Sequence, residues 1–251
     1  MIINGRPWYL FGVSFSLSAS LMLHPVAKAD DSILFPAIPA TSENSRGDPL
    51  ITVLPVEPSR RQVQFKFERA SDATRRFADW VIGSDDNSDL PFAIVDKVAA
   101  KVFVFFADGR LRGAAPVLLG LAVGDNAVPG IGNRPLSTIR PNERTTPAGR
   151  FVAAMDHNLH GKEILWVDYD LAVSIHPVVT SNSKERRLQR LATATPLDNR
   201  ISYGCINVPA KFFTDVVRPA FIGTSGIVYV LPETKPLDDI FETYTELGKS
   251  N

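Results

Sequence analysis

Residues 92–111 read FAIVDKVAAKVFVFFADGRL, and two runs within them are rich in β-branched and aromatic residues. The runs FAIVDKV and KVFVFF have the composition that favours β-strands. Asp108-Gly109 follows the second run, and this pair is typical of a tight turn between antiparallel strands. The stretch therefore predicts strands joined by tight turns, with a hairpin that leads into residues 111–123, LRGAAPVLLGLAV.

Outward from this stretch, four more runs have strand-like composition: GRFVAAM (149–155), EILWVDYD (163–170), LAVSIHPVV (171–179) and GIVYVLP (226–232). Two short helices are expected, one capped by Ser71 or Asp72 and one after Pro209 whose apolar residues share a face. The pattern predicts a mainly β domain over residues 91–235, a sandwich or barrel with few short helices. Residues 61–90 are expected to form a helical lead-in and residues 236–251 a C-terminal tail.

The N-terminal segment has the pattern of an export signal. Arg6 is the only charged residue before an apolar run, and Ala27-Lys28-Ala29 supplies the small-x-small pattern of a cleavage site. Residues 1–29 are therefore predicted to be a signal peptide, with an uncleaved membrane anchor as the alternative. We expect the mature chain in the periplasm or cell envelope, without stable insertion in the membrane. Residues 30–60 hold five prolines and are predicted to be a Pro-rich arm or linker.

Composition excludes some classes of protein. Lys+Arg and Asp+Glu both number 27, so the net charge is zero, and nothing indicates a nucleic-acid partner. One cysteine rules out an internal disulfide, which leaves a packing thiol or a reactive one. His157 and His160 lie beside Asp156 and Glu163 in an expected turn, where solvated side chains are favoured over a metal site. We expect neither a metal nor an organic cofactor.

The lone cysteine lies in ISYGCIN, residues 201–207. His176 lies on a predicted strand, on the face opposite to Val173 and Ile175. An imidazole beside Cys205 would accept the thiol proton and make the attacking thiolate. Gly204 would let the backbone turn sharply and present N–H groups to an oxyanion. The sequence supplies these groups, while their proximity depends on the fold.

These residues resemble the signature of the L,D-transpeptidase catalytic domain, in which a strand histidine is followed after a loop by Ser/Thr-His-Gly-Cys. His176, Ser202, Gly204, Cys205, Ile206 and Asn207 match it, and residues 92–111 and TTPAGRF (145–151) resemble two further family segments. The resemblance covers residues 91–235. It implies a thioester mechanism on peptidoglycan stem peptides, with Cys205 as nucleophile and His176 as base. The N–H groups of Gly204 and Cys205 would bind the oxyanion, D-alanine would leave, and an amine would accept the acyl group.

The sequence departs from the family pattern at two places. Tyr203 replaces the usual second histidine, which affects substrate positioning or the reaction outcome more than thiol activation. The segment between His176 and Ser202 is long and rich in cations, and it is expected to form a helical insertion. Either this helix is a solvated lid, or Arg186, Arg187 and Arg200 bind stem-peptide carboxylates. Ser202 is expected to shape the turn, and Asn207 to anchor the loop or contact substrate.

Three functions remain open. The first is L,D-transpeptidation. The second is hydrolysis, either as an L,D-carboxypeptidase or as an amidohydrolase of stem peptides or of wall-attached protein. The third is a catalytically silent module that binds the cell wall. Stem peptides are the expected partner in each case, together with an amine acceptor or a wall-attached protein.

Overall fold

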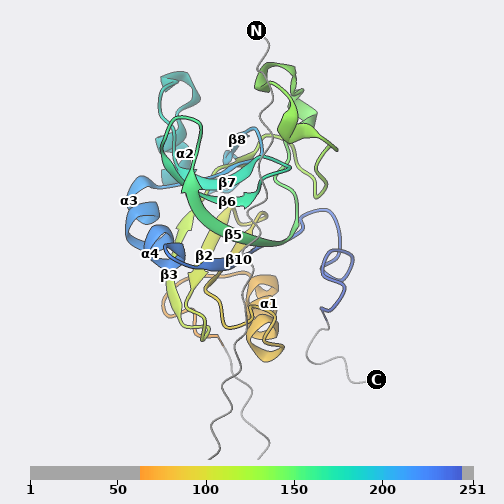
Figure 1. Cartoon of the computed structure of the whole chain (residues 1–251), viewed down its shortest axis with the longest axis vertical. Helices are drawn as coiled ribbons and strands as arrows, with labels where there is room; N and C mark the ends of the chain where they lie inside the picture. The colour runs from red at the N-terminus through yellow and green to blue at the C-terminus, as the bar shows by residue number, and fades with distance from the viewer. Residues whose placement is uncertain (1–62, 245–251) are drawn as a thin grey trace, which may run out of the picture. The chain divides into compact units, whose positions relative to one another are not determined.

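The computed structural model describes residues 63–244, which belong to one compact unit, Pro55–Asn251 (Figure 1). The predicted signal peptide (1–29) and Pro-rich arm (30–60) lie outside the described residues. Within residues 63–244, no helix combines the length and the apolar character needed to cross a bilayer.

The fold is mainly β, as the sequence predicts, and it is built on one eight-stranded mixed sheet with the order β3-β2-β1-β10-β5-β6-β7-β9. The strands are β1 (Phe92–Asp96), β2 (Lys101–Phe105), β3 (Leu111–Pro116), β5 (Gly149–His157), β6 (Glu163–Asp168), β7 (Val173–Pro177), β9 (Ile206–Val208) and β10 (Ser225–Val230). The pairs β1–β10 and β7–β9 are parallel, and the other neighbours are antiparallel. Two further strands, β4 (Leu119–Gly120) and β8 (Arg200–Ser202), form a small parallel sheet.

The predicted hairpin joins β2 to β3. Gly109 donates its N–H to the carbonyl of Phe106, and the N–H of Phe106 bonds to the carbonyl of Arg110. Gly109 has φ +83°, and a Cβ at this position would lie 2.7 Å from Cγ1 of Ile82. Glycine is therefore required both by the backbone conformation and by the close approach of the side chain below it.

The sheet separates two hydrophobic cores. Phe92 and Ile94 of β1 pack toward helix α1 (Asp72–Gly83), whereas Ala93 and Val95 point into the other core. All five residues of β1 are buried, because both faces of the strand are covered. Of the two caps that the sequence predicts, Ser71 is the one that caps α1, and its side chain accepts the N–H of Thr74.

The remaining helices are short. The predicted insertion before Cys205 contains the 3-10 turn η4 (Ser183–Glu185) and helix α2 (Arg187–Ala192). The predicted helix after Pro209 is divided into α3 (Ala210–Phe212), the π-helical turn η5 (Phe213–Val217) and α4 (Arg218–Phe221). Pro219 has no N–H for a regular helical bond, which accounts for the break. Three 3-10 turns, η1 (Ile131–Asn133), η2 (Leu136–Thr138) and η3 (Pro141–Glu143), precede β5.

Candidate active site

The parallel pairing of β7 with β9 brings the histidine and the cysteine segments together. His176 pairs with Asn207 and Ile175 with Ile206, so Cys205 directly precedes its strand beside β7. Successive side chains of a strand alternate between faces, so Ser174 and His176 share one face of β7. Val173 and Ile175 point the other way, into the hydrophobic core, as the sequence predicts.

Cys205 is half-buried, so its thiol is neither sealed in the core nor fully open to solvent. The Ser174 hydroxyl donates to Sγ at 3.6 Å, and Sγ lies 3.4 Å from the carbonyl oxygen of Ala172. Sequence reasoning missed Ser174 as a site residue. Its place two residues before His176, on the same strand face, is the signal that indicates it.

His176 is oriented by the backbone. Its Nδ1 lies 2.8 Å from the carbonyl oxygen of Pro177, and a carbonyl accepts only, so Nδ1 carries the hydrogen. Nε2 is then the basic nitrogen, and the imidazole lies near enough to Cys205 for the two groups to shift each other's pKa. The carbonyl of Pro177 therefore fixes the tautomer that a general base requires.

The histidine and the thiol shift each other's ionisation. Burial lowers the pKa of His176, but the hydrogen bond with Cys205 and the charge of its thiolate outweigh burial and leave that pKa raised. Burial likewise raises the pKa of Cys205, but the hydrogen bond and positive charge of His176, with the bond from Ser174, leave it lowered. Both directions favour a thiolate–imidazolium pair.

The turn before Cys205 is held by its own side chains. The Ser202 hydroxyl donates to the carbonyl of Cys205 at 2.6 Å and accepts the N–H of Gly204 at 3.1 Å. Gly204 has φ +135°, and a Cβ there would lie 2.8 Å from the carbonyl oxygen of Thr145. Ser202 thus shapes the turn, and only glycine fits at position 204.

The segment TTPAGRF lies against this turn. Thr146 is fully buried, donates its hydroxyl to the carbonyl of Gly204 at 2.8 Å and accepts the N–H of Gly120 at 2.9 Å. Its own carbonyl accepts from Nζ of Lys97 at 2.9 Å, and Lys97 is paired with Asp125 at 2.7 Å. A buried ion pair and a buried hydroxyl therefore support the backbone that carries Cys205.

The expected oxyanion donors need one correction. The N–H of Gly204 is already bonded to Ser202, so it does not point at an oxyanion in this conformation. Within residues 63–244, the N–H of Cys205 meets no acceptor. The structure thus leaves Cys205 itself as the backbone donor beside the thiol.

Tyr203 lies at the surface, with 37% of its area exposed. The guanidinium of Arg144 covers its ring, with Cζ 3.9 Å from the ring centroid. Tyr203 therefore pairs with Arg144, which lies on the same segment as Thr145 and Thr146. No signal in the sequence connects Arg144 with Tyr203.

The four residues predicted to bind substrate have different surroundings. Arg187 donates from Nη1 to Oδ1 of Asn207 at 2.7 Å. Asn207 is fully buried, so it anchors the loop and has no surface for the expected substrate contact. The guanidinium of Arg200 pairs with Glu233. Arg186 is exposed and forms no ion pair with the other described residues.

Two other groups of residues lie apart from this cluster. His157 and His160 are exposed, and within residues 63–244 no three His, Cys, Asp or Glu side chains are grouped to hold a metal ion.

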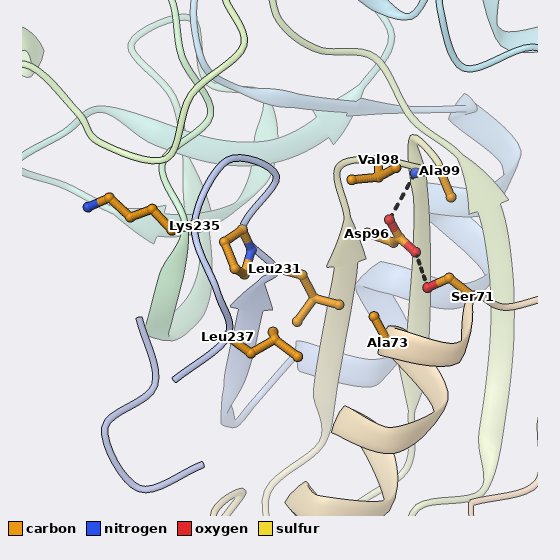
Figure 2. A pocket seen from close by; sticks show the side chains of 9 residues that line it. Ser71, Ala73, Asp96, Val98, Ala99, Leu231, Lys235 and Leu237 are labelled. Atoms are coloured by element: carbon orange, nitrogen blue, oxygen red, sulfur yellow. Dashed lines mark hydrogen bonds between the residues drawn. The ribbon is translucent and has the colours of Figure 1, made fainter. Parts of the chain in front are cut away.

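A hollow of about 320 Å³ opens where α1 meets the β1–β2 turn (Figure 2). Asp96 lies in its wall and accepts the Ser71 hydroxyl at 2.6 Å and the N–H of Ala99 at 2.8 Å. Both of its carboxylate oxygens are therefore hydrogen-bonded within the chain. None of the residues around Cys205 lines this hollow.

No protein-family model and no curated protein matches the chain. Similar solved structures include an L,D-transpeptidase in complex with imipenem, with 16% identity and a TM-score of 0.34 over 57% of this chain and 59% of that one. The L,D-transpeptidase from Xylanimonas cellulosilytica has 13% identity and a TM-score of 0.35 over 57% of this chain and 60% of that one. The catalytic domain of the E. faecium L,D-transpeptidase has 16% identity and a TM-score of 0.31 over 57% of this chain and 98% of that one. The chain thus spans less than two thirds of the length of the first two structures. At these identities and TM-scores, the function has to be argued from the residues of this chain.

Proposed function

We propose that this chain is a cysteine acyltransferase that acts on peptidoglycan stem peptides as an L,D-transpeptidase in the cell envelope. The observation that carries the proposal is the position of a half-buried thiol beside His176, whose Nδ1 is bound by a backbone carbonyl. A nucleophile, a base and a group that orients the base are the parts that covalent acyl transfer requires. The substrate class follows from the resemblance of His176 and residues 202–207 to the L,D-transpeptidase signature.

In the first half-reaction, Nε2 of His176 takes the proton of the Cys205 thiol, and Sγ attacks the carbonyl that follows the L-centre of the third stem residue. The N–H of Cys205 donates to the oxyanion of the tetrahedral intermediate. Nε2 then gives its proton to the departing amine, the C–N bond breaks, and D-alanine leaves. A thioester on Cys205 remains.

In the second half-reaction, an acceptor amine loses its proton to His176 and attacks the thioester carbonyl. The C–S bond breaks, the new amide forms, and the thiolate is restored. Water in place of the amine gives a free carboxylate, which is carboxypeptidase activity. The amine acceptor and water therefore compete for the same intermediate, and the product identifies which of the two enters.

The experiment that tests this function uses the purified chain with defined muropeptides that end in D-alanine. Products are weighed after incubation with and without an amine acceptor. Transpeptidation predicts a cross-linked product that needs the acceptor, together with released D-alanine. Loss of D-alanine with and without the acceptor, and no cross-linked product, would establish the hydrolase instead. If wild type gives no product, as Cys205→Ala should not, only a binding role would be left.

A further inference from the structure

The inserted helix reaches the catalytic pair through one side chain. Arg187 is the first residue of α2, and its Nη1 donates to Oδ1 of Asn207 at 2.7 Å. Its Nε donates to Glu185 at 2.5 Å, so the guanidinium is held at both edges. Asn207 pairs with His176 in the parallel register of β7 and β9, and its side chain contacts both Arg187 and the imidazole.

Both the oxygen and the nitrogen of the buried Asn207 amide have partners. Its oxygen accepts from Arg187, while Nδ2 lies 3.3 Å from the carbonyl of Cys205 and 3.5 Å from Nε2 of His176. An asparagine amide can be turned end for end with little change of shape, so its partners decide which atom faces where. Arg187 only donates, so it requires the oxygen on its own side. The amide nitrogen must then face His176.

This orientation acts on the histidine. An N–H group aimed at Nε2 is compatible with an unprotonated nitrogen that accepts, and it opposes a proton on Nε2. The reversed amide would offer its oxygen to Nε2–H and would stabilise the imidazolium. We propose that Arg187 is a positioning residue which, through Asn207, keeps the amide nitrogen toward His176 and so holds the imidazole as a base for Cys205.

Of the charges near the imidazole, that of Arg187 acts in the same sense as the amide, and that of the Cys205 thiolate opposes it. After burial, Cys205 is the strongest influence on the pKa of His176 and raises it, whereas the positive charge of Arg187 lowers it. These are the two charged groups with the largest effect on the ring, one just before β9 and one from α2. Glu185 forms an ion pair with the guanidinium of Arg187 and so partly offsets its positive charge.

The inference changes the role expected for the insertion. The sequence suggests either a solvated lid or a set of cations that bind carboxylates. In the structure, Arg187 is turned inward to a buried amide, and of the three arginines expected to bind carboxylates only Arg186 is exposed and without an ion pair to another described residue. Helix α2 thus helps to set the protonation state of His176. The inference rests on the proposed function only in treating His176 as that base.

The test is an NMR titration of His176, which needs no substrate and therefore succeeds or fails independently of the proposed reaction. All variants carry Cys205→Ala, so the thiol does not titrate with the ring. The chain has four histidines, and the resonance of His176 is identified by its loss in His176→Gln. Arg187→Gln is compared with the parent and with Arg186→Gln, which removes an adjacent exposed charge.

We expect Arg187→Gln to move the titration midpoint of His176 upward, because the positive charge is lost and Asn207 is free to turn. Arg186→Gln should leave the midpoint in place. Arg187→Lys keeps a charge but not the guanidinium, and its midpoint should lie between those of the parent and Arg187→Gln. The Lys variant also serves as the measurement if Arg187→Gln does not fold. A midpoint that stays in place or falls when Arg187 is changed to Gln or Lys would overturn the inference.

Discussion

Ser174 and Cys205 are joined by a hydrogen bond, with the Ser174 hydroxyl 3.6 Å from Sγ. The two residues are 31 positions apart in the chain, and the β7–β9 pairing brings them together. Ser174 is buried, so its hydroxyl acts on the sulfur in an environment shielded from water. The bond favours the thiolate and helps to lower the pKa of Cys205.

Ser174→Ala should therefore slow the alkylation of Cys205 by iodoacetamide at neutral pH. We expect a decrease of roughly fivefold, which corresponds to one hydrogen bond worth about 1 kcal/mol. The exposed Ser137→Ala is the matched control and should react at the wild-type rate. An unchanged rate in Ser174→Ala would show that this hydroxyl has no effect on the thiol.

His176→Gln should move the pH profile of the same alkylation upward. The lowered pKa of Cys205 depends on the hydrogen bond and charge of His176, and without them burial raises it. Wild type should therefore remain reactive below about pH 8.5, the ordinary thiol value, while the variant reacts only at higher pH. Superimposable profiles would contradict the assignment of His176 as the partner of the thiol.

Gly204→Ala should lose both stability and activity. The residue has φ +135°, and its new Cβ would lie 2.8 Å from the carbonyl oxygen of Thr145. We expect a cost of about 1–3 kcal/mol in the free energy of unfolding, measured in urea.

The control for this substitution is Gly130→Ala, at φ +69°, where an added Cβ would have nothing within 4 Å. This substitution also places alanine in a left-handed backbone conformation, but its Cβ meets no other atom. It should therefore lower the free energy of unfolding by only about 1–2 kcal/mol and leave thiol reactivity intact. Equal reactivity of Cys205 in both variants would show that the turn does not position the thiol.

Thr146→Val tests the support behind the turn. The substitution keeps the shape of the side chain, removes the donor to the carbonyl of Gly204 and leaves the buried N–H of Gly120 without its acceptor. We expect a loss of about 1–3 kcal/mol in unfolding free energy and slower acylation of Cys205. Thr138→Val, at an exposed hydroxyl that bonds locally to Pro135, should be close to neutral. If Thr146→Val is as stable as wild type, Thr146 does not support the turn that carries Cys205.

The architecture could be predicted from local patterns. Runs rich in β-branched and aromatic residues and the Asp108-Gly109 turn predict the hairpin β2–β3, and Ser71 or Asp72 predicts the start of α1, because each signal acts within a few residues. The π-helical turn was not predicted, although Pro219 marks where a regular helix fails. The two-residue strand β4 is too short to leave a periodic signal.

The motif points to Cys205, His176 and Ser202, and the fold places these three residues next to one another, while their catalytic roles stay a prediction. The sequence did not predict the long-range contacts around them. The bond from Arg187 to Asn207 spans 20 positions, and Thr146 reaches Gly204 across 58. Such contacts depend on the register of β7 against β9 and on the path of the loop before β5, which no sequence window contains. The occupied N–H of Gly204 was missed because a hydroxyl two residues away competes for it.

The central claim is that Cys205 is a nucleophile activated for acyl transfer, and intact-mass measurement after exposure to imipenem tests it most directly. Attack of the thiolate on the β-lactam carbonyl opens the ring and leaves the whole compound bound to sulfur. The account predicts one added imipenem per chain in wild type, none in Cys205→Ala, and slower addition in His176→Gln. A folded wild-type chain that gains no mass, or an equal adduct on Cys205→Ala, would contradict it.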